Sequence, residues 1–267
     1  MIQLNPPPPG GADSEGPEAW SGAPIERRAY AAPYESLTFS MTTRARRELT
    51  VTLAAQPVFD LGKSEAVSRR VRRIIRHRGG EPALFALGRR TLDAVDLKRI
   101  DLQTLRHGLE LLSHGVEDSG VLPVFWRTVA SSSGRFALLC AELQHGPPRG
   151  VLLVEVMGGL EQTPPEAVAE AVSHFVTESM GVILHIAPDP AAAARFTGVP
   201  AHCLALDFAG VEHESAREWD GARHLIEVAR SACPQVLLLN LRPDRGLAAR
   251  AAGATHAVFA GMDAVTV

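Results

Sequence analysis

The stretch from Gln56 to Arg78, QPVFDLGKSEAVSRRVRRIIRHR, begins as a buried strand and a turn and ends in a run of positive charge. Its last ten residues contain six arginines and one histidine, although the chain of 267 residues has a formal net charge of -3. A nucleic-acid-coating protein is usually basic over its whole domain, so nucleic acid is not the favoured partner. We interpret 49–59 as a first strand and the charged segment 66–73 as a second.

Short apolar runs alternate with amphipathic helices along the rest of the chain. One helix is predicted at 101–112, where leucines recur on a single face. Further strands are predicted at 121–126, 150–156, 181–186, 202–208, 235–241 and 256–261. Continuous apolar strands separated by helices are typical of a parallel sheet that is covered on both faces. About eight strands favour a closed (β/α)8 TIM-like barrel over an open sheet.

Capping boxes predict the starts of two helices. Thr163 precedes Pro164, a residue suited to the first helical position, and Glu166 follows three residues after the threonine. Ser215 and Glu218 have the same spacing. Thr163 and Ser215 are therefore expected to be N-caps.

The chain is expected to divide into a disordered tail at 1–32, rich in proline and glycine, and one barrel domain at 33–267. Hydrophobic residues make up 46% of the sequence, which is enough for a sizeable core. We find no secretory signal pattern and no apolar run of bilayer-spanning length, and we expect a cytoplasmic protein without a membrane partner.

Neither the cysteines nor the glycines suggest a cofactor. Cys140, Cys203 and Cys233 are far apart in apolar surroundings, which predicts buried thiols rather than disulfides or a zinc site. The glycines form no phosphate-binding pattern, and the histidines show no metal-binding spacing. We therefore expect no cofactor and no metal.

Three short motifs, QPVFDL at 56–61, LVEV at 153–156 and ALDF at 205–208, occur in an order and spacing that resemble a known family. This family is the EAL domain, a bacterial phosphodiesterase that hydrolyses cyclic di-GMP. The resemblance is of low identity and covers about residues 45–261. It implies a barrel of the EAL type and a metal-dependent hydrolytic site.

Most residues of that implied site are replaced. Counting without gaps from Asp60, the glutamate of the EAL motif falls on Arg70. The metal-binding asparagine of the VNLS strand falls on Arg127, in the segment VFWRTV. Glu155 matches the first glutamate of the LEITE motif, and Gly158 stands in place of the second.

The later motifs show the same losses. The aspartate of the KID motif survives as Asp207, and Asp189 matches one of the paired aspartates only after a small shift. The other replaced positions are Ala187 and Pro188 for the paired aspartates, Ala205 for the KID lysine and Leu239 for the VAEGVET glutamate.

Magnesium requires oxygen ligands, and a two-metal site needs several carboxylates. One glutamate beside two guanidinium groups does not satisfy this requirement, so the sequence predicts a catalytically inactive protein. The vestigial site would comprise Arg70, Arg127, Glu155 and Asp207. We further predict that Arg127, or failing it Arg70, lies within salt-bridge distance of Glu155 and stands in for the metal.

The main hypothesis is a regulatory or scaffolding protein that binds another protein, with a homodimer left open. The alternative is a receptor that binds cyclic di-GMP without cleaving it, using Arg70 or Arg127 to hold phosphates. A working phosphodiesterase, built on Glu155, Asp189 and Asp207, is the least favoured hypothesis.

The arginine run permits three interpretations. It is a partly solvated strand face, a docking patch for an acidic protein, or, least favoured, a nucleic-acid surface, because no aromatic residues are interleaved to stack bases. The candidate docking patch consists of Arg69, Arg72, Arg73, Arg76 and Arg78.

Overall fold

The computed structural model describes residues 36–77, 81–82, 92–113, 119–145, 151–176, 181–211 and 215–261. Contacts divide the chain into two units, Met1–Pro33 and Tyr34–Val267, and all described residues belong to the second. The tail expected at 1–32 and the arginine at position 78 lie outside the described residues. Every structural statement below concerns the second unit.

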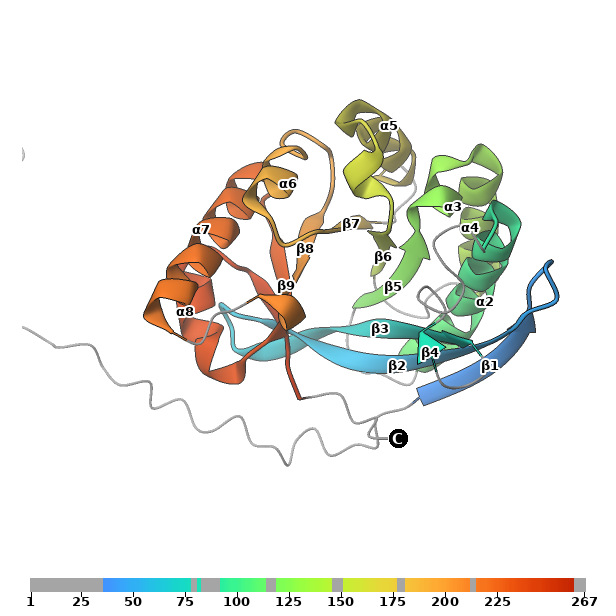
Figure 1. Ribbon diagram of the computed structural model, residues 1–267, viewed down its shortest axis with the longest axis horizontal. Helices are drawn as coiled ribbons and strands as arrows, with labels where there is room; N and C mark the ends of the chain where they lie inside the picture. Colours follow the sequence, from blue (N-terminus) through green and yellow to red (C-terminus); the bar gives the residue numbers. More distant parts are fainter. Residues whose placement is uncertain are drawn as a thin grey trace, which may run out of the picture. The chain divides into compact units, whose positions relative to one another are not determined.

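Eight strands of the second unit form a closed barrel, as predicted (Figure 1). Their order around the ring is β2-β10-β9-β8-β7-β6-β5-β3, and pairing of β2 with β3 closes it. The strands are β2 (Glu48–Asp60), β3 (Glu65–His77), β5 (Ser119–Phe125), β6 (Val151–Met157), β7 (Gly181–Ile186), β8 (Cys203–Asp207), β9 (Val236–Leu241) and β10 (His256–Phe259).

The first barrel strand runs against its neighbours, which corrects the expectation of an all-parallel sheet. β2 pairs antiparallel with both β3 and β10, whereas the pairs from β3 through β5 to β10 are parallel. The connection from β2 to β3 is too short to hold a crossover helix, so the two strands must form a hairpin. The Asp60 carboxylate accepts hydrogen bonds from the amides of Gly62 and Lys63 and fixes this turn.

Two more strands extend the sheet beyond the barrel. β2 and β3 have 13 residues each and continue past the ring as a ribbon. β1 (Ser36–Thr42) pairs antiparallel with the first half of β2, and β4 (Glu81–Pro82) pairs with the end of β3. The sequence interpretation did not include these outer strands.

The α-helices lie outside the ring of strands (Figure 1). They are α2 (Ala94–Ser113), α3 (Trp126–Ala130), α4 (Ser132–His145), α5 (Pro165–Val176), α6 (Pro190–Ala194), α7 (Ala216–Ala232) and α8 (Gly246–Ala251). The helix predicted at 101–112 is the second half of α2, whose Leu97, Ile100, Leu105 and Leu109 are buried. None of the described helices is both long and apolar enough to span a bilayer.

One of the two capping predictions is confirmed. Ser215 and Glu218 form a complete capping box at the start of α7. Thr163, in contrast, is not an N-cap, because α5 begins only at Pro165 and the Thr163 hydroxyl donates back to the carbonyl of Gly159. The second proline of the pair therefore takes the first helical position.

Apolar side chains fill the barrel interior. The buried cluster consists of Val58, Val121, Ile183, Cys203, Ala205, Leu237, Leu239 and Val258, with Leu153 packed against it. The thiols of Cys203 and Cys233 are buried and that of Cys140 is half-buried, and all three cysteines are free, in line with the expectation of unbridged thiols.

Candidate functional site at the barrel mouth

Glu155 is the central charged residue of the barrel interior. It lies on β6 two residues after Leu153, which packs into the apolar interior cluster, and alternate strand residues face the same side. Its side chain is 0% exposed. An ionised carboxylate at such depth requires a charged or hydrogen-bonding partner.

Arg70 supplies that partner from β3. Its Nε donates to Glu155 Oε2 at 2.6 Å, and its Nη2 donates to Glu155 Oε1 at 2.9 Å. Its Nη1 donates to Gln56 Oε1 on β2 at 2.9 Å. Arg70 is only 6% exposed, so this bidentate ion pair is largely removed from water.

A histidine completes the cluster. His185 on β7 places its Nδ1 2.7 Å from Glu155 Oε1. Because an ionised carboxylate can only accept, Nδ1 is the donor, and Nε2 of a neutral ring is then an acceptor. The side chain is 21% exposed, which leaves the ring accessible from the mouth of the barrel.

Glu155 is held in its ionised form. Burial raises the pKa of this carboxyl. The charge of Arg70 and the hydrogen bonds from His185 and Arg70 together lower it by more, and the resulting pKa is about 2. The cluster therefore combines one carboxylate, one guanidinium and one imidazole. Their hydrogen bonds favour a rigid, mutually satisfied polar network over an open site with an unpaired charge.

The predicted salt bridge is confirmed for Arg70 and is wrong for Arg127. Arg127 lies on α3 and is exposed, because β5 ends at Phe125 and a helix begins at Trp126. The β5 residue in register with Glu155 is Pro123, which has no side-chain ligand atom. The position assigned to the family's asparagine therefore lies past the end of the strand.

Asp207 makes its hydrogen bonds with residues outside the cluster. Its Oδ1 accepts a hydrogen bond from Asn240 Nδ2 at 2.7 Å and another from the amide of Ala209, so it caps the short helical turn after β8. Asp189 likewise acts as the N-cap of α6 and accepts from the Ala192 amide. Both aspartates have local structural partners.

The described residues do not fit a divalent cation at Glu155. Both of its oxygens are engaged by Arg70, and Gly158, Ala205 and Leu239 offer no oxygen side chain. Within the described ranges, no three His, Cys, Asp or Glu side chains gather as metal ligands.

Comparisons with known proteins identify the fold. No family model matches the chain, and no curated protein matches it. The FimX EAL domain from Pseudomonas aeruginosa, bound to c-di-GMP, superimposes with a TM-score of 0.61 at 14% identity, covering 78% of this chain and 88% of that one. The fold resembles that of EAL domains.

Two further solved structures agree with this EAL-like fold. The Xanthomonas citri FimX EAL domain in complex with c-diGMP has a TM-score of 0.58 at 13% identity and covers 81% of this chain and 91% of that one. A standalone EAL protein from Vibrio cholerae O395, also in a c-di-GMP-bound form, has a TM-score of 0.56 at 12% identity, covering 78% and 88%. At these identities the likeness concerns the fold alone.

Sequence reasoning missed Gln56 and His185 as members of the cluster. Gln56 is a buried amide in the apolar strand β2, and His185 lies two residues after the inward-facing Ile183. Strand alternation would have placed the histidine inside the EAL-like barrel.

The arginine run does not form one surface. The side chain of Arg73 is only 2% exposed and pairs with Asp101 of α2 at 2.7 Å, with its guanidinium 4.0 Å above the Phe125 ring. Arg69 also reaches toward α2. Arg72 alternates with Arg73 along β3 and therefore faces the other side. The predicted docking patch is therefore not a single surface, because the Arg73 side chain is buried and Arg72 faces away from Arg69.

The barrel also contains a cavity of about 250 Å³, distinct from the cluster. It is lined by Val58, Val67, Ser68, Ser119, Val121, Val151, Leu153, Ile183, His202, Cys203, Gln235, Leu237 and His256. Several of these residues begin parallel strands, so the cavity lies toward the N-terminal end of the barrel. Sites in such barrels form at the opposite end, which favours a packing defect over an active site.

Proposed function

We propose that the chain is a catalytically inactive EAL-like domain that acts as a bacterial regulatory or scaffolding protein through protein–protein interaction. The observation that carries this proposal is the two-pronged contact of Arg70 with Glu155. It is supported by the EAL-like fold and by the sequence resemblance, which sets Arg70, Gly158 and Leu239 at positions where the family has glutamates.

The chemistry of metal-dependent hydrolysis explains why this contact matters. Two dications need several carboxylates, and they activate the water that attacks the phosphodiester. A dication approaching Glu155 would meet the positive charge of Arg70 in a buried setting, and separating the ion pair to admit it would cost several kcal/mol. The site is therefore closed to the family's chemistry.

A second candidate is a non-hydrolysing cyclic di-GMP receptor. The FimX EAL domains that share the fold are described as bound to c-di-GMP, which favours this possibility. However, Nε, Nη1 and Nη2 of Arg70 already have partners, so Arg70 has little left to offer a phosphate. Receptor function is thus the alternative and not the first proposal.

Hydrolysis assays test the inactive state. We expect no turnover of cyclic di-GMP above the buffer rate with either magnesium or manganese, for the wild-type chain and for Glu155→Gln alike. Turnover by the wild type that Glu155→Gln abolishes would overturn the proposal and restore the phosphodiesterase hypothesis.

Isothermal titration with cyclic di-GMP separates scaffold from receptor. A scaffold gives no binding heat up to high micromolar ligand. Binding that is weakened by His185→Ala, at the mouth, and unaffected by Arg127→Ala, on the outer face of α3, would instead identify a receptor that uses the barrel mouth.

A further inference from the structure

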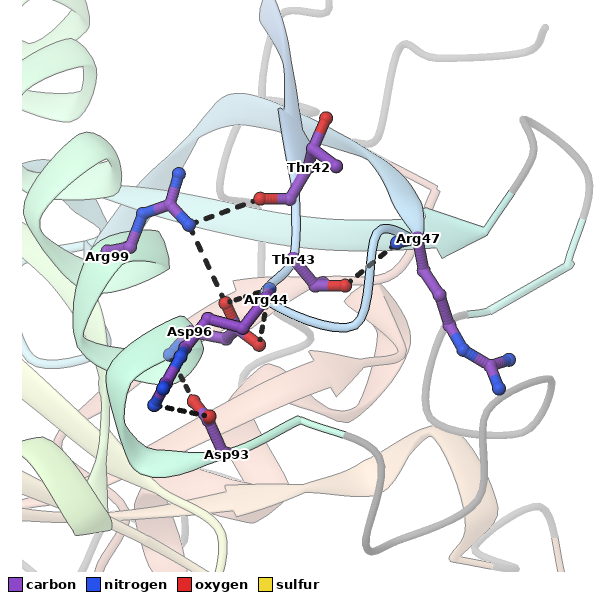
Figure 2. Close-up of polar contacts among 7 residues, drawn as sticks. All are labelled: Thr42, Thr43, Arg44, Arg47, Asp93, Asp96 and Arg99. Atoms are coloured by element: carbon purple, nitrogen blue, oxygen red, sulfur yellow. Dashed lines mark hydrogen bonds and ion pairs between the residues drawn. The ribbon is translucent and has the colours of Figure 1, made fainter.

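The loop between β1 and β2 is anchored to the start of α2 (Figure 2). The amide of Arg44 donates to both carboxylate oxygens of Asp96, at 3.0 and 3.3 Å, and its side chain pairs with Asp93 at 3.3 Å. Asp96 is only 1% exposed. Arg99 bridges Asp96 and the carbonyl of Thr42, so the loop is held from two sides.

Hydrogen bonds within the loop fix its backbone. Thr43, 4% exposed, accepts from the amide of Arg46 through its carbonyl and from the amide of Arg47 through its hydroxyl. Arg46 has a φ of 56°, a left-handed conformation that non-glycine residues adopt at some energetic cost. The loop therefore presents its side chains in a preset arrangement, which lowers the entropy lost on binding.

This loop carries uncompensated positive charge. Arg46 and Arg47 are exposed, and Figure 2 shows the Arg47 side chain extending away from Asp93 and Asp96. The two aspartates are already engaged by Arg44 and Arg99. In the part of the chain that the structure describes, neither Arg46 nor Arg47 has a carboxylate within salt-bridge distance.

Within the described ranges, the neighbouring strand β1 has an unpaired edge. Among the described strands it pairs only with β2, through seven consecutive residue pairs without a bulge. Its sequence, SLTFSMT, contains no proline and no charged residue. Natural sheets usually protect exposed edges with such residues or with bulges, and β1 has none of these devices.

We propose that the β1 edge and the Arg46–Arg47 loop together form a docking surface for an acidic, extended segment of a partner protein. The segment would add to the sheet as a strand beside β1, with main-chain hydrogen bonds giving affinity. Because β1 runs toward the loop, the acidic end of the added strand lies next to Thr42. This inference rests on the proposed function and names the surface it uses.

The chemistry of the surface favours such a segment over other occupants. The exposed side chains of β1 are Ser36, Thr38, Ser40 and Thr42, which provide no ring to stack a base, so nucleic acid is disfavoured. A second copy pairing through β1 would bring no carboxylate from that strand to the arginines. An acidic strand would supply hydrogen-bond partners to the main chain of β1 and carboxylates to Arg46 and Arg47.

Hydrogen exchange on the full chain tests the surface directly. The probes are short valine–threonine peptides that carry three glutamates at the N-terminal end or at the C-terminal end, with lysine counterparts. At about 1 mM peptide, we expect at least about tenfold slower exchange of β1 amides with one of the glutamate peptides, and no change with the lysine peptides.

Charge variants locate the binding. Arg46→Glu with Arg47→Glu should lower the affinity for the glutamate peptide by about tenfold or more. The matched control, Arg217→Glu with Arg250→Glu on α7 and α8, should leave this affinity unchanged. Arg46→Gly with Arg47→Gln removes the charge while suiting the left-handed backbone, and it should weaken binding even if the glutamate variant folds poorly.

Three outcomes would overturn the inference. These are no β1 protection by either glutamate peptide, equal binding of the lysine peptides, or tighter binding of a single-stranded oligonucleotide to the same loop. A protein partner whose affinity survives both loop variants would refute this surface and leave the proposed function standing. Turnover of cyclic di-GMP would instead refute the proposed function, whatever happens at β1.

Discussion

The guanidinium of Arg70 holds both carboxylate oxygens of Glu155, although β3 and β6 are not neighbouring strands. β5 lies between them, so the ion pair crosses the barrel interior above the apolar cluster. The contact therefore ties two separated parts of the ring together. It also gives the buried charge of Glu155 a partner in a place where a metal would otherwise be needed.

A double-mutant cycle should reveal strong coupling between these two residues. Arg70→Met or Glu155→Gln alone leaves a buried polar or charged group without its partner, and each should lower the free energy of unfolding by about 3 to 5 kcal/mol. The double variant should lose much less than the sum of the two. Urea denaturation measures all four proteins, and the exposed Arg127→Met serves as a control expected within about 0.5 kcal/mol of wild type. Additive losses would contradict the assigned role of the pair.

The ionisation of Glu155 should make stability depend on acidic pH. Burial is the largest single influence and raises the pKa, but the Arg70 charge and the hydrogen bonds from His185 and Arg70 together outweigh it and lower the pKa from the ordinary 4.5 to about 2. A lowered folded pKa means that the contribution is complete above pH 4.5 and is lost as the pH falls toward 2. The advantage of wild type over Glu155→Gln should shrink by about 3 kcal/mol across this window. Thermal melts at a series of pH values measure it, and a constant difference would contradict the prediction.

Reversing the charge of Arg70 tests whether arginine takes the place of a cation. Arg70→Glu would place two carboxylates together beside Gln56 and His185, an arrangement that repels itself without a positive charge. We expect this variant to be destabilised and then to gain thermal stability with millimolar manganese or magnesium. Wild type and Arg70→Met should show no such gain. If the melting temperature of Arg70→Glu does not rise with added cations, the cluster cannot hold a metal even with a second carboxylate.

Sequence patterns predicted the barrel because most of its strands are short, continuous apolar runs separated by helices. The parallel order failed at β2, where a four-residue connection, fixed by Asp60, forces a hairpin. The ribbon strands β1 and β4 lie outside the barrel and alternate in burial or are very short, so they give little hydrophobic signal.

Only part of the site could be predicted from the sequence, and the reason is physical. Arg70 and Glu155 both lie within regular strands, where counting residues preserves the facing side. Arg127 lies beyond the end of β5, where the chain turns into α3 and counting no longer reports direction. His185 escaped notice because an isolated histidine in an apolar strand shows its partner only once the neighbouring strands are placed.

Asp101 should produce the opposite pH dependence on the outer side of the barrel. Burial raises its pKa from 3.8 to about 6, and the charge of Arg73, 2.7 Å away, only partly offsets this effect. Because the folded pKa is the higher one, protonation favours the folded state. The stabilising contribution is present in full below pH 3.8 and is lost as the pH rises through 6.

Asp101→Asn removes this titration and leaves that of Glu155 in place. The stability of wild type minus that of the variant should therefore fall by about 3 kcal/mol between pH 4 and pH 7, in addition to a pH-independent difference from replacing the carboxyl group by an amide. Urea denaturation at four pH values measures the difference. Ser231→Ala, at an exposed position on α7, is the control and should show no pH-dependent difference from wild type. A difference that grows with rising pH would mean that attraction to Arg73 outweighs the burial of Asp101, and that this pair stabilises the fold most strongly when both groups are charged.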